Sequence, residues 1–107
     1  MSKLPCFDDT NLQAISDVLG DANSGLTHAE ISQLLRQCGI TELLPNGTKR
    51  SRIFEDLSQR QKHDNCGNNV AAFIIAAMKP VRYVGNAQRF EDLRLKLNRV
   101  LSFTGLT

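Results

Sequence analysis

One stretch of the chain, residues 70–78, is apolar at every position, whereas apolar residues elsewhere recur every three or four positions. A helix without a polar face has to be covered on all sides, so this stretch predicts a buried central helix over about residues 68–79. Asn68 or Asn69 is expected to cap its start, and Pro80 prevents its continuation. Nine apolar residues are too few to cross a bilayer, which takes about 20 residues.

Two amphipathic helices are predicted before residue 40. The first has a capping residue within positions 8–10, and Gly20 ends it. The second spans residues 28–38, because Thr27 and Glu30 have the spacing of a capping box ahead of an apolar helical stripe. Both helices carry their apolar residues on one side, which indicates that they pack against the central helix.

A loop and two further helices are predicted around the apolar stretch. The loop covers residues 40–47, and from it Leu43 and Leu44 are expected to reach the core. Thr48 is expected to cap the helix that follows. Asn86 is expected to cap the last helix, which carries an apolar stripe at positions 87, 90, 93, 97, 100 and 101.

Together these elements predict an all-α fold, a compact bundle of five to six short helices around the buried central helix at about 68–79. The last helix is expected to stop at residues 104–106. A chain of 107 residues is the size of a single domain, so we expect one helical interaction or regulatory domain over 1–107. Death-fold adaptor domains have a similar plan, which is a likeness of architecture alone.

The two halves of the chain carry charges of opposite sign. Residues 1–47 hold two basic and six acidic residues, whereas residues 48–107 hold eleven basic and five acidic ones. Such a molecule can attract copies of itself head to tail or present a basic face to an acidic partner. Alternatively, the two halves neutralise one another inside the fold.

We therefore expect a protein partner or self-association, mediated by charged patches at helix surfaces. One basic patch is expected at the start of the third helix, where three cations oppose the helix dipole, and another on the last helix. The acidic counterpart is expected on the first two helices. The candidate binding residues are Lys49, Arg50 and Arg52, then Arg89, Lys96 and Arg99, and on the acidic side Asp17, Asp21 and Glu30.

The sequence lacks the patterns that catalysis or metal binding requires. His63 and Cys66 form one loose H-x-x-C pair, whereas a structural zinc site shows paired ligands on both sides. Adjacent carboxylates such as Glu55 and Asp56 diverge on a helix, and no phosphate-binding glycine loop is present. We therefore expect neither an enzyme, nor a metal, nor a cofactor.

Nucleic-acid binding is the alternative function. Residues 26–54 scan like a helix-turn-helix motif whose second helix would offer Lys49, Arg50 and Arg52 to phosphates. However, the connection between the two helices is about eight residues, where the compact motif has three or four. Three widely spaced cysteines and the absence of a signal peptide indicate a reduced, cytoplasmic protein.

Several short stretches together resemble a known family and cover nearly the whole chain. They are LPCFD (4–8), LGD (19–21), GLT (25–27), EI (30–31), TKR (48–50), FI (73–74), MKPVRYV (78–84) and LNRVL (97–101). This set is similar to the N-terminal domain of abortive-infection (AbiJ-like) HEPN proteins of bacteria. The resemblance implies a sensing, regulatory or oligomerising role in anti-phage defence.

In that family a C-terminal HEPN domain, a presumed RNase, follows this domain. The HEPN active-site pattern is an Arg followed four to six residues later by a His, and neither His28 nor His63 fits it. No catalytic residue is therefore carried over to this chain. Because the chain ends where the HEPN domain would follow, we expect a fragment or a stand-alone module that acts on such an effector.

Overall fold

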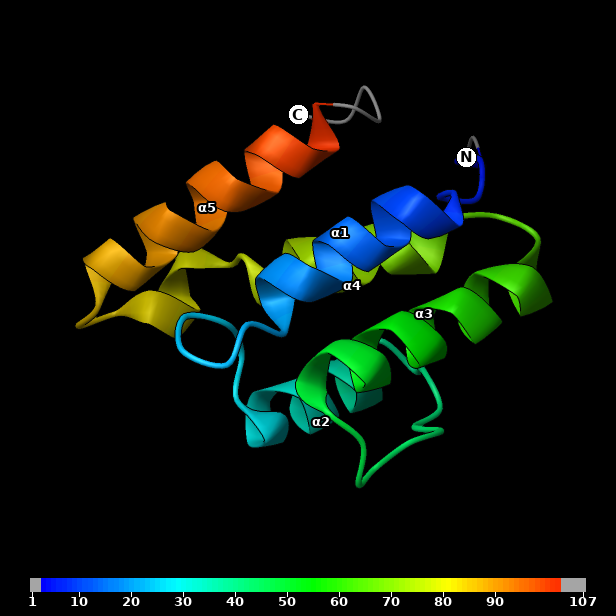
Figure 1. Cartoon of the computed structure of the whole chain (residues 1–107), viewed down its shortest axis with the longest axis horizontal. Coiled ribbons are helices and arrows are strands. Elements are labelled where there is room, and N and C mark those ends of the chain that lie inside the picture. Colours follow the sequence, from blue (N-terminus) through cyan, green and yellow to red (C-terminus); the bar gives the residue numbers. More distant parts are fainter. Residues whose placement is uncertain (1–2, 103–107) are drawn as a thin grey trace.

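The computed structural model describes residues 3–102 and confirms the all-α prediction within that range (Figure 1). It contains five α-helices and one short 3-10 helix, and no strand among the described residues. The Cα radius of gyration is 12.9 Å, close to the ~13 Å of a compact 100-residue domain. The elements are α1 (Asp9–Leu19), α2 (His28–Gln37), α3 (Lys49–Asp64), α4 (Asn68–Ala77), η1 (Pro80–Tyr83) and α5 (Ala87–Leu101).

Helix α1 lies between α3 and α5, while α4 packs against α2 and α3 (Figure 1). Leu12, Ile15 and Leu19 of α1 have no exposed surface. They share one core cluster with residues of α2 to α5. No helix of the described range combines the length and apolar character needed to cross a bilayer. The expected stop at residues 104–106 lies outside the described residues.

The prediction that α4 is covered on every side is wrong. Val70, Phe73 and Ala77 are fully buried, but Ala72 is exposed and the side chain of Ile75 is 66% exposed. The reason is the position of α5, which packs on α1 and η1 instead of closing the outer side of α4. Helix α4 is therefore a core helix that is open to solvent on one side.

Side-chain caps form at four helix starts, as predicted. Asp8 Oδ1 accepts a hydrogen bond from Asn11 N at 2.7 Å, and Thr48 and Asn86 cap α3 and α5 in the same way. Thr27 and Glu30 form the complete capping box. These contacts are local, so the sequence alone determines them.

The caps predicted for α4 are wrong. Gly67 occupies the N-cap position, and no side chain caps the helix. Asn68 Oδ1 instead accepts a hydrogen bond from Leu4 N, and Asn69 Nδ2 donates to Asp64 Oδ2. Both amides are therefore used to hold neighbouring segments rather than the first turn of α4.

The prediction that Leu43 and Leu44 reach the core is also wrong. They are 45% and 40% exposed, and Ile40 takes the core position with 5% exposure. Polar groups orient this loop, because Leu43 N donates to Asp56 Oδ1 at 2.8 Å and Glu42 pairs with Arg52. The loop is thus fixed to α3 with both leucine side chains directed outward.

A buried glutamine fastens the segment before α1 to the end of α3. Gln61 Oε1 accepts from Phe7 N at 2.9 Å, and Gln61 Nε2 donates to Phe7 O at 2.8 Å. Gly67 N donates to Leu4 O at 2.9 Å. These bonds satisfy the buried backbone of the segment and place the Phe7 ring in the core.

Candidate functional site

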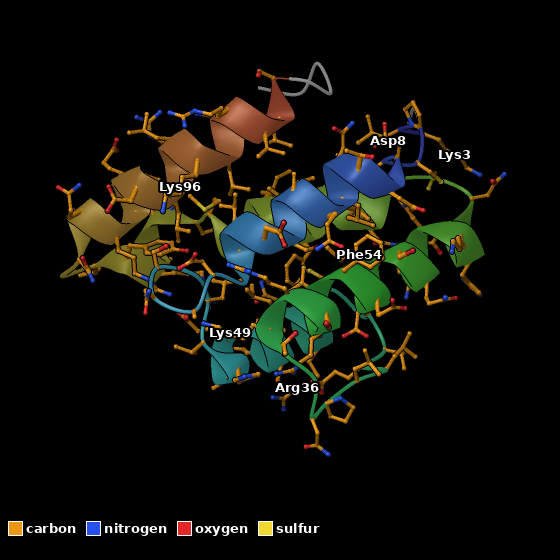
Figure 2. The ribbon with its side chains drawn as sticks, in the orientation of Figure 1. Lys3, Asp8, Arg36, Lys49, Phe54 and Lys96 are labelled. Atoms are coloured by element: carbon orange, nitrogen blue, oxygen red, sulfur yellow. The ribbon has the colours of Figure 1, made fainter. Side chains whose placement is uncertain are left out.

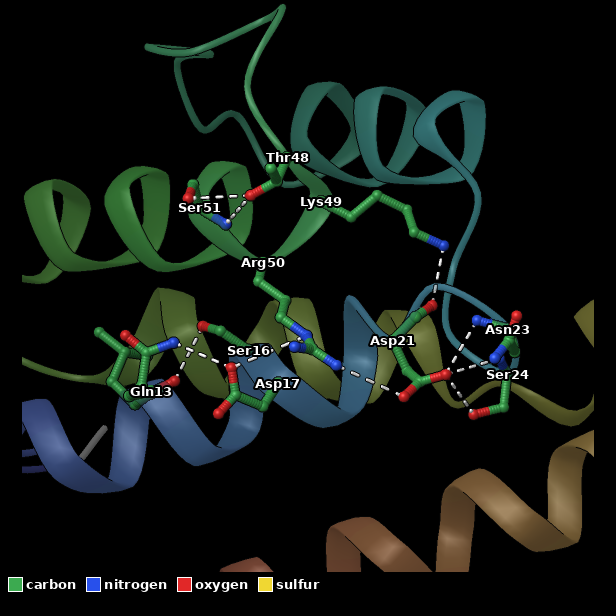
Figure 3. A network of polar contacts seen from close by, with 11 residues as sticks. Gln13, Ser16, Asp17, Asp21, Asn23, Ser24, Thr48, Lys49, Arg50 and Ser51 are labelled. Atoms are coloured by element: carbon green, nitrogen blue, oxygen red, sulfur yellow. Dashed lines mark hydrogen bonds and ion pairs between the residues drawn. The ribbon is translucent and has the colours of Figure 1, made fainter.

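Four of the candidate residues meet one another at the junction of α1 and α3 (Figure 3). Arg50 Nη2 lies 3.6 Å from Asp21 Oδ2, and Arg50 Nε lies 4.0 Å from Asp17 Oδ1. Lys49 Nζ donates to Asp21 O at 2.8 Å. We call Lys49, Arg50, Asp17 and Asp21 the charged seam. The side chains of Arg50 and Asp17 are about half exposed, so the charged seam is on the surface, but its charges are paired within the chain.

Asp21 also organises the turn that follows α1. Its Oδ1 accepts from the backbone N–H groups of Asn23 and Ser24, each at 2.9 Å, and from the Ser24 hydroxyl at 3.1 Å. These bonds, led by the one from the Ser24 backbone, lower the pKa of Asp21 to about 2. Asp21 therefore stabilises the turn that follows α1 and also pairs with Arg50.

Glu30 forms a second intramolecular charge cluster. Its Oε1 accepts from Arg89 Nη2 at 2.9 Å, and Arg82 Nη2 lies 3.6 Å from its Oε2. The Arg89 guanidinium also donates to Gly25 O and lies over the ring of Tyr83, 5.3 Å from its centre. Burial opposes ionisation of Glu30, but the bonds from Arg89 and from Thr27 N lower its pKa overall.

Arg52 lies inside the fold rather than on a binding patch. Its side chain is 2% exposed. Nη2 donates to Glu42 Oε1 at 2.6 Å and to Ser32 Oγ at 2.7 Å, and Nη1 lies 2.8 Å from His28 Nδ1. Because a guanidinium only donates, His28 Nδ1 accepts this bond. The expectation that Arg52 is presented on a surface patch is therefore wrong.

Lys96 and Arg99 of α5 are the exposed cations among the candidates that form no ion pair within the described residues. Figure 2 shows Lys96 on the side of α5 that faces the turn after α1, where Nζ lies 3.3 Å from Ser24 Oγ. Arg99 lies one turn further along the same helix. These two residues keep their charge available for a partner.

The opposite charges of the two halves of the chain are thus largely used inside the fold. Arg50 pairs with acids of α1 and the turn after it, Arg52 pairs with Glu42, and Arg89 pairs with Glu30. Every one of these contacts joins a residue before position 48 to a residue after it. These pairs neutralise charges of the two halves within one molecule, which is one of the alternatives that the sequence left open.

A pocket of about 400 Å³ lies between the loop after Ile40 and the outer side of α3. Its most buried polar group is Asp56, which is 1% exposed. Asp56 Oδ1 accepts from Leu43 N, whereas Oδ2 has no hydrogen-bond partner among the described residues. The residues around the pocket are Ile40, Thr41 and Leu43 from the loop, with Asp56, Gln59, Arg60 and His63 from α3.

Sequence reasoning missed this pocket. Glu55 and Asp56 were expected to diverge as neighbours on a helix, and they do, since Asp56 is buried and Glu55 is not. The one available signal was an acid at position 56 within the apolar spacing of Ile53 and Leu57. Burial raises the pKa of Asp56, against the opposing hydrogen bond from Leu43 N.

His63 and Cys66, considered above for metal binding, do not belong to a cluster of metal ligands among the described residues. The side chain of His63 is 84% exposed and lies beside Asp64, while Cys66 is 8% exposed. Over residues 3–102, no three side chains of His, Cys, Asp or Glu are close enough to hold a metal ion.

Comparison of the chain with protein-family models, with curated proteins and with solved structures finds no match. The likeness to AbiJ-like N-terminal domains therefore stays a prediction that rests on the sequence stretches quoted above.

Proposed function

We propose that this chain is a non-catalytic protein-interaction domain that self-associates through an apolar surface at η1. The observation that carries the proposal is the exposure of two valines in one short segment: Val81 is 73% and Val84 is 83% exposed. We call Pro80, Val81 and Val84 the η1 surface. All three residues are exposed and apolar, and Lys79 beside them is exposed as well.

The local backbone supports a docking role for the η1 surface. Val81 lies within η1 and Val84 directly follows it as the C-cap residue, so the two exposed valines stand three positions apart in one short segment. The segment lies at one end of the long axis of the molecule, between α4 and α5 (Figure 1). Burying a valine side chain is worth roughly 1.5–3 kcal/mol, so paired valines on two copies give a substantial driving force.

Charged surfaces contribute orientation and selectivity in this proposal. Lys96 and Arg99 are available without breaking an ion pair of the described residues, and Lys96 would release only its hydrogen bond to Ser24 Oγ, whereas Arg50 and Asp17 would have to exchange their present partners. Complementary charges of this kind raise the rate and specificity of association more than its strength. Lys96 and Arg99 therefore contribute to the choice of partner, and the η1 surface holds it.

The sequence resemblance adds a biological setting to the proposal. If the chain is related to AbiJ-like N-terminal domains, its self-association would assemble or restrain a defence effector such as a HEPN domain. What supports this setting is the set of sequence stretches, together with the all-α fold.

The test is the molar mass of the protein in solution, measured by light scattering over a wide range of concentrations. We expect the mass of the wild-type chain to rise with concentration and Val84→Asp to stay monomeric. Leu95→Asp is the matched control, because Leu95 is also exposed, at 56%, but belongs to α5. A wild-type chain that is monomeric at every concentration would contradict self-association.

Salt separates the two contributions. Association through the η1 surface should persist or strengthen with added salt, whereas association through charges should weaken as salt screens them. Arg50→Glu is the charge-reversal variant to use, because its side chain is 52% exposed. Arg52→Glu would bury a new charge beside Glu42 and would report on folding instead.

A further inference from the structure

We propose that the pocket between the 40–43 loop and α3 is a binding site for an ammonium or guanidinium group on an alkyl stem, held by Asp56. This site is separate from the η1 surface and from the charged seam. The pocket is lined in part by Asp56, whose buried Oδ2 has no hydrogen-bond partner among the described residues.

Asp56 has one carboxylate oxygen that receives no hydrogen bond among the described residues. Its side chain is almost completely buried, and only one of its two oxygens receives a hydrogen bond. Buried polar groups in folded proteins are nearly always paired, and a carboxylate is among the most costly to leave unpaired. A group that donates to Oδ2 is therefore expected at this position.

The two nearby arginines do not donate to Asp56 Oδ2. The Arg52 guanidinium is directed to Glu42, Ser32 and His28. Arg60 Nε donates to Asp64 Oδ2 at 2.8 Å, and its Nη1 donates to Gly39 O at 2.6 Å. The charge of Arg52 acts on Asp56 through space and opposes the rise of its pKa, but neither arginine donates a hydrogen bond to Oδ2, and Arg52 Nε is itself buried without a partner among the described residues. A cationic donor from outside would supply the hydrogen bond that Oδ2 lacks.

The size and the walls of the pocket suit a small cation on an alkyl stem. A volume of about 400 Å³ is within the range of small-ligand sites. Ile40 and Leu43 provide apolar contact for an alkyl stem, and the amide of Gln59 lies at the polar side. Oδ2 itself has almost no accessible surface, so contact requires a small rotation of the Asp56 carboxylate or of the half-exposed Leu43 side chain.

The chemistry fits two sources, a free alkyl amine or guanidine and the side chain of a lysine or arginine in a peptide. Two probes distinguish them: n-butylguanidinium for the free cation and acetyl-arginine-amide for the peptide side chain. Each is titrated into the full ¹⁵N-labelled chain, and amide shifts are followed by NMR. We expect saturable shifts at Thr41, Leu43 and Gln59, and the tighter probe identifies the source.

The decisive variant is Asp56→Asn. The asparagine Oδ1 can still accept from Leu43 N, while a donor replaces Oδ2 and the charge is lost. We expect binding of the better probe to weaken at least tenfold. Glu55→Gln is the matched control, because it removes a charge from the neighbouring position outside the pocket, and it should leave affinity within about twofold.

An anionic analogue of similar length, n-pentanoate, keeps the test valid if Asp56→Asn does not fold. It should cause no saturable shift at the pocket amides of the wild-type chain. The proposal is overturned if the cations give no saturable shifts, which would mean that water satisfies Oδ2. It is equally overturned if pentanoate binds as well as the cations, or if the two variants lose affinity alike.

Discussion

Arg50 and Arg52 stand two residues apart in the first turn of α3 and have opposite surroundings. The side chain of Arg50 is 52% exposed, and its ion pairs measure 3.6 and 4.0 Å. The side chain of Arg52 is 2% exposed, and its contact with Glu42 measures 2.6 Å. Two residues of helix correspond to a rotation of about 200°, so the two side chains leave α3 on opposite sides.

The difference shows that position around a helix decides what a charge does for a fold. Arg50 is directed over α1 toward solvent, where water competes with its acidic partners. Arg52 is directed under α3 toward α2 and the 40–47 loop, where four polar groups replace its hydration. Three experiments can break or sharpen this comparison.

The largest effect is expected for Arg52→Met. The substitution keeps much of the volume but leaves Glu42, Ser32 and His28 without their common donor. Removing one partner of a buried pair costs about 3–5 kcal/mol, and the partial exposure of Glu42 places the expected loss near the lower figure, ~3 kcal/mol. Urea unfolding followed by circular dichroism measures the free energy of unfolding.

Arg50→Met is the matched control for that experiment. Surface ion pairs contribute about 0–1 kcal/mol, so this variant should unfold at nearly the wild-type urea concentration. If Arg50→Met and Arg52→Met lost the same stability, the assigned difference between the two sides of α3 would be wrong.

An intermediate effect is expected for Gly20→Ala, which acts at the backbone of Arg50 rather than at its charge. A Cβ atom at position 20 would lie 2.8 Å from Arg50 N and 2.9 Å from Arg50 Cα. The junction of α1 and α3 would have to open, at a cost of about 1–3 kcal/mol. Because this cost is steric, it should be equal at low and high salt; a loss that disappears in salt would contradict the assignment.

The smallest effect is expected for Asp21→Asn, which keeps an Oδ1 acceptor for the turn but loses the charge; the variant should be slightly less stable than wild type at neutral pH, and the difference should vanish in acid. The pKa of Asp21 is about 2 in the fold, below its usual range near 4, so the unfolded chain binds the proton more readily. Its contribution to stability is therefore complete above about pH 4 and is lost as the pH falls toward 2. Asp21→Asn should flatten this part of the stability profile.

Arg50→Met should leave the same acid profile nearly unchanged. The low pKa of Asp21 comes first from the backbone N–H groups of Ser24 and Asn23 and then from the Ser24 hydroxyl. Unfolding monitored from pH 5 to pH 2 compares the two variants. A flattened profile for Arg50→Met would show that the exposed seam, and not the turn, determines the acid response.

The sequence was a good guide wherever the determining contacts are local. The capping box of Thr27 and Glu30 closes within four residues, and the left-handed Gly39, with φ of 70°, ends α2 as its position predicts. Helix existence and most helix limits depend on such contacts. They were therefore predictable without any knowledge of the tertiary structure.

The candidate site was less predictable because long-range packing determines it. The burial of Arg52 depends on Ser32 and Glu42, which are 20 and 10 residues away. The exposure of Ile75 depends on where α5 packs, and the apolar run around it contains no information about that position. A list of charges along the chain likewise does not say which of them meet inside one molecule.

The two hydrogen bonds between Gln61 and Phe7 hold one end of the molecule together, and this end offers a place for a label. These bonds tie the segment before α1 to the end of α3, opposite along the long axis to η1 (Figure 1). Cys6, an exposed thiol in that segment, gives a place for a fluorescent label that leaves the η1 end untouched. Energy transfer between copies labelled at Cys6 would therefore tell end-to-end from side-by-side assembly.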